Sequence, residues 1–173
     1  MQDFLLVAIA HFLALLSPGP DFFLVARSAL AQGWRGVVGA CLGITLANGM
    51  FIVAAFGGVA VLRPGSALFI AVQLAGCAYL PYLGWLFLRH AGKSTLEALP
   101  ATGKAPWRAG MGMGFLSAIL NPKNALFYVS LASVVASRQT SSGWTLAYGA
   151  WMVCAVLAWD MAVALAIGNA TLR

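Results

Sequence analysis

The chain has 173 residues, of which 62% are hydrophobic and only 8% are charged, and its mean hydropathy is +0.90. Soluble domains carry about 25% charged residues, so this composition excludes an ordinary soluble fold and predicts a membrane protein. The net charge of +6 does not indicate nucleic-acid binding, because the basic residues lie between the hydrophobic runs and form no patch interleaved with aromatic residues.

Five hydrophobic stretches are long enough to cross a bilayer, which takes about 20 helical residues. Alternating strand patterns are absent from the sequence, so we expect an all-α membrane protein with residues 1–173 in a single polytopic domain. The N-terminus has neither the basic region nor the cleavage site of a signal peptide, so the first stretch is expected to be retained. The stretches cover residues 4–26, 36–62, 66–88, 110–136 and 144–168.

The first stretch contains the motif Ser17-Pro18-Gly19-Pro20-Asp21. Its two prolines remove two backbone donors and clash with the preceding turn, so the motif predicts a broken helix. Broken backbone at membrane depth is tolerated only against protein or a water-filled cavity. The Asp21 carboxylate has two possible roles here. It either caps the helix that restarts, or it binds a substrate ammonium group and carries a proton.

Two further features of the first two stretches bear on packing and polarity. His11 precedes the break by a few residues, and a structural hydrogen bond and a proton relay are equally open for it. The spacing Gly39-x-x-x-Gly43 permits close helix packing and makes a homodimer a possibility. The cysteines lie inside apolar runs without ligand spacing, which indicates small buried side chains; they are Cys41, Cys77 and Cys154.

A second break, Asn121-Pro122-Lys123-Asn124, interrupts the fourth stretch. Lys123 could pair with a carboxylate, either of an acidic side chain or of a substrate, or its ammonium group could extend to the membrane interface. Asn121 and Asn124 could hydrogen-bond a zwitterion. Alternatively, they satisfy backbone groups that Pro122 leaves free.

Asp160 lies deep in the fifth stretch, with apolar residues on both sides. Burial favours the protonated form of a carboxyl group, which can then exchange a proton. Asp160 is therefore predicted to couple transport to protons, and an interhelical hydrogen bond is the structural alternative. Asn48 occupies a roughly corresponding place in the second stretch and is a candidate polar partner.

The two breaks suggest an internal repeat. Pro18 and Pro122 are 104 residues apart, and Gly33-Trp34 and Gly143-Trp144 are 110 residues apart. The units, about 4–88 and about 110–168, begin three stretches apart, so the second enters the membrane in the opposite direction. Paired interrupted segments in an inverted repeat point to a transporter's substrate site. Two unrelated proline kinks are the alternative, and a sixth stretch is expected to complete two three-helix units.

Lysine and arginine residues are distributed unequally between the two sides. One set of connections carries seven basic residues and the other carries two, so the positive-inside rule places the N-terminus outside and residues 89–109 in the cytoplasm. The first set comprises Arg27, Arg35, Arg89, Lys93, Lys104, Arg108 and Arg173, and the second comprises Arg63 and Arg138.

The sequence contains no nucleophile–base pair, metal-ligand cluster or phosphate-binding loop. A membrane enzyme would also need polar residues clustered at one interface. We therefore expect neither catalysis nor a cofactor nor a metal.

Several motifs together resemble the LysE/RhtB family of amino-acid exporters. They are Leu16-Ser17-Pro18-Gly19-Pro20-Asp21, Gly33-x-x-Gly36, Ala75-Gly76-x-Ala78-Tyr79-Leu80-x-x-Leu83-Gly84, Leu120-Asn121-Pro122-Lys123-Asn124-Ala125-Leu126-Phe127 and Asp160. The resemblance implies an inner-membrane protein that exports amino acids such as threonine, homoserine or lysine in exchange for protons. It also implies six hydrophobic segments and a dimer. The chain stops before the last of these segments, which predicts a truncated or five-span form.

The function that we expect is secondary active export of an amino acid or a related zwitterion, by antiport with protons. The substrate would lie between the two breaks, with its carboxylate at Lys123 or the asparagines and its ammonium group at Asp21. Asp160 or Asp21 would exchange the proton. The alternative is a truncated or non-transporting membrane protein that acts as an assembly partner.

Overall fold

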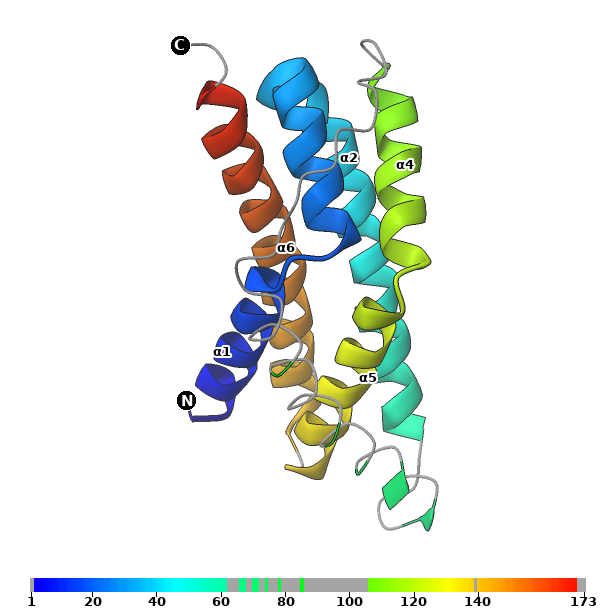
Figure 1. Cartoon of the computed structure of the whole chain (residues 1–173). Coiled ribbons are helices and arrows are strands. Elements are labelled where there is room, and N and C mark those ends of the chain that lie inside the picture. The colour runs from blue at the N-terminus through cyan, green and yellow to red at the C-terminus, as the bar shows by residue number, and fades with distance from the viewer. Residues whose placement is uncertain are drawn as a thin grey trace.

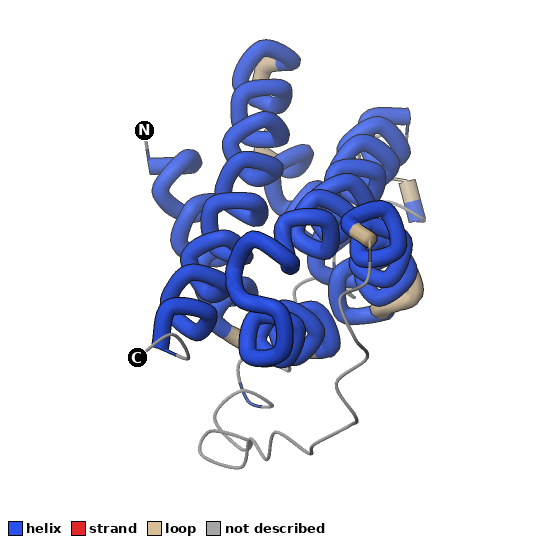
Figure 2. The backbone as a smooth tube through the Cα atoms, turned by 90° about the horizontal axis from the view of Figure 1, so that it is seen from above, coloured by secondary structure: helices blue, strands red, loops and turns tan. Residues whose placement is uncertain are grey.

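The computed structural model describes residues 2–61, 106–138 and 140–170, together with Ser66, Ala67, Ile70, Ala71, Leu74, Ala78 and Trp85. In these residues it contains five helices and no strand, which confirms the predicted all-α class (Figure 1). Most of the predicted third stretch, most of the 89–109 loop, and Cys77 lie outside the described residues. Seen from above, the helices form one bundle (Figure 2).

The first predicted stretch is divided between two helices. Helix α1 (Gln2–Leu16) ends immediately before the proline motif, and α2 (Pro20–Val61) begins at its second proline. Proline suits the first position of a helix because the N–H group that it lacks would have no partner there.

Helix α2 reverses direction at Gly33. The backbone there has φ 71° and ψ 169°, a region that is essentially restricted to glycine. Figure 1 shows the first part of α2 rising from the middle of the molecule and the second part returning beside it. The reversal falls within the connection predicted between the first two stretches.

The fourth stretch is also divided, and the fifth is continuous. Helix α4 (Trp107–Ile119) ends just before the second break, α5 (Pro122–Ser137) begins at its proline, and α6 (Ser142–Ala170) follows. The succession α4–α5 descends in Figure 1, whereas α1 and the first part of α2 ascend. Two segments, Pro20–Gly58 and Ser142–Asn169, are long and apolar enough to cross a membrane.

Helices α2 and α4 touch through their backbones along a row of glycines, which we call the glycine seam. A Cβ atom added to Gly39 or Gly43 would clash with backbone atoms of Trp107 or Met111, and one added to Gly114 would clash with the Ala40 carbonyl. The seam joins helices of one chain, so the Gly39-x-x-x-Gly43 pattern gives no support for a dimer.

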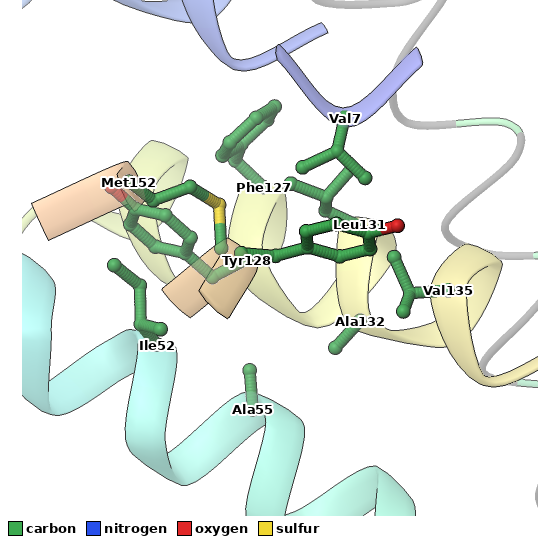
Figure 3. Packing of buried hydrophobic residues seen from close by; sticks show 10 residues of the cluster. Val7, Ile52, Ala55, Phe127, Tyr128, Leu131, Ala132, Val135 and Met152 are labelled. Atoms are coloured by element: carbon green, nitrogen blue, oxygen red, sulfur yellow. The ribbon is translucent and has the colours of Figure 1, made fainter. Parts of the chain in front are cut away.

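Buried side chains form two clusters, one in each half of the bundle. The N-terminal cluster fills the half that contains the N-terminus, and Figure 3 shows its side chains interdigitating between α1, α2, α5 and α6. It consists of Val7, Ile52, Ala55, Phe127, Tyr128, Leu131, Ala132, Val135, Tyr148 and Met152. The kink cluster fills the half that contains the Gly33 reversal and consists of Val25, Ala29, Val37, Ala40, Cys41, Ile44, Ala47, Ala118, Val156 and Ala164.

Large apolar side chains also cover much of the outside of the bundle. Such a surface would be unfavourable in water but suits contact with lipid chains. Examples are Leu5, Ile9 and Leu13 on α1, Val53 on α2, and Leu146 on α6.

Candidate functional site

The two helix breaks lie against each other at the middle of the bundle. A Cβ atom added to Gly19 would lie 3.7 Å from Lys123 Nζ and 3.9 Å from Asn121 Nδ2. The first break therefore approaches the second within ordinary contact distance.

The Asp21 carboxylate belongs to the first break, but its hydrogen-bond partners belong to α4, α5 and the second break. Ser117 Oγ donates to Oδ1 at 2.7 Å, and Asn124 Nδ2 donates to Oδ2 at 2.8 Å. Asn121 Nδ2 makes a longer contact of 3.5 Å to Oδ2. All three donors are neutral, so the negative charge of Asp21 is solvated by dipoles, without a cation among these partners.

The Lys123 side chain makes the reciprocal contact to the first break. Its ammonium group donates to the carbonyl of Ser17 at 2.7 Å and to that of Ala14 at 3.2 Å. These carbonyls lie at the C-terminal end of α1, where helical partners are missing and Pro18 and Pro20 supply no N–H. Lys123 thus caps α1 and does not extend to the membrane interface.

The asparagines of the second break also satisfy backbone groups. Asn121 Oδ1 accepts from the Lys123 N–H at 3.1 Å and so caps the N-terminus of α5. Asn124 Nδ2 has a second acceptor, the Ala118 carbonyl at 3.4 Å. Both asparagines therefore have the predicted structural role of satisfying backbone groups, and both also contact Asp21. Their hydrogen bonding to a zwitterion stays a prediction.

A small cavity of about 50 Å³ lies where the breaks meet. Asp160 lines it and is only 6% exposed, and its Oδ2 atom has no hydrogen-bond partner among the described residues. The cavity thus brings together two carboxylates from α2 and α6 and an ammonium group from α5. Its lining residues are Ala14, Leu15, Ser17, Gly19, Asp21, Phe22, Ile44, Asn48, Asn121, Lys123, Asn124, Val156, Trp159 and Asp160.

Two residues singled out in the sequence have partners that the sequence did not indicate. Asn48 lines the cavity, but its amide donates to the Ile44 carbonyl of its own helix at 2.9 Å. His11 lies outside the cavity lining, and its Nε2 atom is 3.3 Å from the Tyr128 hydroxyl. Asn48 and Asp160 line the same cavity, and the role of Asn48 as a polar partner of Asp160 stays a prediction.

Ser117 and Tyr128 were not predicted. A serine or a tyrosine within an apolar helix carries no distinctive pattern, so neither residue gave a signal. Only the packing of α4 and α5 against α1 and α2 shows that their hydroxyl groups face Asp21 and His11.

The chemistry that this site can perform is binding and release. It holds opposite charges and neutral amides around a buried cavity, which suits a small polar ligand with both an amino and a carboxylate group. Among the described residues, no group of three histidine, cysteine or acidic side chains could hold a metal ion.

An all-helical bundle with membrane-length apolar helices and a charged cavity at two helix breaks defines a polytopic membrane carrier. The sequence comparison makes this specific: residues 12–173 match the family described as LysE type translocator. The chain belongs to this family, whose members are transporters and not enzymes. No solved structure matches the chain.

Individual relatives are membrane and efflux proteins. The chain is 27% identical to the uncharacterized membrane protein YahN of Escherichia coli K12, over 83% of the chain and 65% of that relative. It is 30% identical to the threonine efflux protein of the same organism, over 93% of the chain and 80% of the relative. A leucine efflux protein of Klebsiella pneumoniae is 30% identical over 74% of the chain and 60% of its own length. The chain thus spans less than two thirds of some curated relatives.

Proposed function

We propose that the protein exports an amino acid, or a related small zwitterion, from the cell. The observation that carries this proposal is the placement of the Asp21 carboxylate and the Lys123 ammonium group on one buried cavity, each held by neutral groups. The names of the threonine and leucine efflux relatives support an amino acid as the substrate.

The two charges suggest how a zwitterion binds. Its ammonium group replaces neutral donors at Asp21, and its carboxylate accepts from Lys123, which has three N–H donors. Hydrogen bonds to charged groups are about twice as strong as neutral ones, so both ends of the ligand gain on entering the site. The ligand's side chain faces the apolar lining at Phe22, Val156 and Trp159.

The cavity must enlarge to admit a substrate. At about 50 Å³ it has room for about one or two water molecules of roughly 30 Å³ each. Pockets for small ligands start at about 300 Å³. We therefore propose that the cavity widens during transport as one helical unit moves against the other.

Proton coupling is assigned to Asp160. This residue is buried, lines the cavity and has a carboxylate oxygen that finds no partner in the part of the chain that the structure describes. A carboxylic acid in this position exchanges its proton more readily than one fixed by hydrogen bonds. Asp21 is the second candidate for the proton.

The proposed arrangement in the membrane follows from the opposite directions of the helix pairs on either side of the two breaks (Figure 1). We propose two inverted units in the inner membrane, with the N-terminus outside and residues 89–109 in the cytoplasm. The basic side chains Arg35 and Arg108 lie over the rings of Trp34 and Trp107, a pairing that suits a membrane interface. A homodimer remains a prediction, which the mass of the detergent-solubilised protein tests.

The decisive experiment measures efflux of radiolabelled amino acids from loaded vesicles that contain the purified chain. We expect Asp21→Asn and Asp160→Asn each to reduce efflux at least tenfold, because each removes a cavity charge. Ser133→Ala, which removes a hydroxyl group bonded within its own helix, is the matched control and should behave like the wild type. Wild-type efflux by either aspartate variant would exclude that residue's role, and absence of efflux by the wild-type chain would favour the non-transporting alternative.

A further inference from the structure

Three polar contacts join α1 to α5 along their length, and we call them the α1–α5 ladder. Nearest the cavity, Lys123 caps the carbonyls of Ala14 and Ser17. Further along, His11 is hydrogen-bonded to Tyr128.

The third contact is at the far end of both helices, where Arg138, the C-terminal cap of α5, forms an ion pair with Asp3. The three contacts of the ladder therefore extend from the cavity to the N-terminal end of the bundle.

The ladder occupies the half of the molecule that blocks one exit from the cavity. Tyr128 and Val7 belong to the N-terminal cluster, which fills the space between the cavity and the N-terminal end (Figure 3). A substrate that leaves the cavity toward this end must displace that cluster. Separation of α1 from α5 would open a route through this cluster, because Val7 on α1 packs there together with side chains of α5.

The opposite half of the bundle is built differently. The glycine seam brings the backbones of α2 and α4 into direct contact. Backbone contacts leave no side chains that could rotate away, so a rigid α2–α4 pair is expected to move as one body.

The contact between His11 and Tyr128 is the most buried of the three. Its hydrogen bond favours the closed state, in which both side chains are buried. Loss of this hydrogen bond is therefore expected to favour separation of α1 from α5.

From these contacts we propose that α1 and α5 form the gate on the N-terminal side of the translocation path, with His11 and Tyr128 as its central contact. Opening separates the two helices along the ladder, while the glycine seam stays closed. This inference rests on the proposed transport function for its purpose, but the gate can be observed without measuring transport.

The test uses a single reporter cysteine at the cavity, Ser17→Cys, in a chain whose native cysteines are replaced by serine. A membrane-impermeant methanethiosulfonate reagent is applied to intact cells and, separately, to inverted vesicles. We expect Tyr128→Phe and His11→Leu to raise the labelling rate about two- to tenfold from one side only. This is the population shift that loss of one ordinary hydrogen bond produces.

Ser130→Ala is the matched control, because it also removes a buried hydroxyl group from α5 but one that is bonded to the Leu126 carbonyl of the same helix. It should leave the labelling rate unchanged. Unchanged labelling in the Tyr128 and His11 variants, or an equal increase in all three, would overturn the proposal.

A second measurement avoids variants that fold poorly. The protein carries Asp3→Cys and Arg138→Cys, and a bifunctional thiol reagent with a reducible linker bridges the two cysteines. The bridge should hold these ends of α1 and α5 together and stop efflux until it is reduced. Full efflux by the bridged protein would contradict the gate. If Tyr128→Phe and His11→Leu raise the labelling rate as expected but the wild-type chain exports nothing, only the proposed transport function is contradicted.

Discussion

Ser117 is the least conspicuous residue of the site, and its hydroxyl group makes the shortest hydrogen bond to Asp21. The bond fixes Oδ1 of the carboxylate while the asparagines contact Oδ2. Ser117 is therefore a positioning residue for the proposed binding of an ammonium group. Ser117 is expected to affect substrate binding only by holding the Asp21 carboxylate in position.

The first prediction is that Ser117→Ala weakens substrate binding without abolishing transport. A hydrogen bond to a charged group contributes about 1.5–3 kcal/mol, and other donors remain, so KM should rise by roughly tenfold with little change in the maximal rate. Efflux kinetics in vesicles provide the measurement. Ser117→Thr, which restores the hydroxyl group, should recover most of the affinity, and failure of this rescue would show that bulk and not hydrogen bonding matters.

At the same scale, the sequence identified the charged residues and missed their partners. Asp21, Lys123 and Asp160 were recognisable because charges at membrane depth are costly and rarely accidental. The alternatives for Lys123 were a carboxylate or the interface, whereas the structure shows two backbone carbonyls. Such a contact depends on where the C-terminal end of α1 lies in space relative to α5, and no local pattern in the sequence encodes that position.

At the level of helices, the glycine seam determines how closely α2 and α4 approach. Gly43 is tightly enclosed, since a Cβ atom there would clash with the Met111 carbonyl. A Cβ atom added to Gly112 on α4 would meet no atom of the described residues within 4 Å. These two glycines offer a comparison between the same substitution in closed and in open surroundings.

The second prediction follows from this comparison. Gly43→Ala should destabilise the protein by about 1–3 kcal/mol, because overpacking forces the backbones apart. Gly112→Ala should be neutral or stabilise it by up to about 1 kcal/mol through better helix propensity. Unfolding in detergent, followed by circular dichroism, measures both. Equal stability of the two variants would contradict the close approach of α2 and α4.

Proline placement explains why helix breaks were easier to predict than helix packing. Pro20 and Pro122 each stand at the start of a helix, as their missing N–H groups require. The glycine spacing of α2 was equally visible, but spacing does not name the partner helix, and α4 of the same chain was not anticipated.

For the whole molecule, the class of the fold followed from composition alone, because a chain that is 62% hydrophobic needs lipid around it. The arrangement of the helices did not follow, since apolar surfaces fit one another in many ways. The small cavity arises from that arrangement. The sequence singled out its charged and amide side chains, but neither its apolar lining, such as Phe22 and Trp159, nor its size.

The third prediction concerns the orientation of the bundle. Ser141 and Pro106 are exposed and directly precede α6 and α4, which begin at opposite ends of the bundle (Figure 1). In a cysteine-free background, an impermeant thiol reagent should label Ser141→Cys in intact cells and Pro106→Cys only in inverted vesicles. The reverse pattern would overturn the positive-inside assignment, but it would leave the site and the gate unchanged.

The cap that Lys123 places on α1 also bears on the way the protein is made. The carbonyls of Ala14 and Ser17 leave the ribosome more than a hundred residues before the side chain that satisfies them. The first segment therefore acquires this cap only after the fourth stretch has been synthesised, and until then its two carbonyls need other partners.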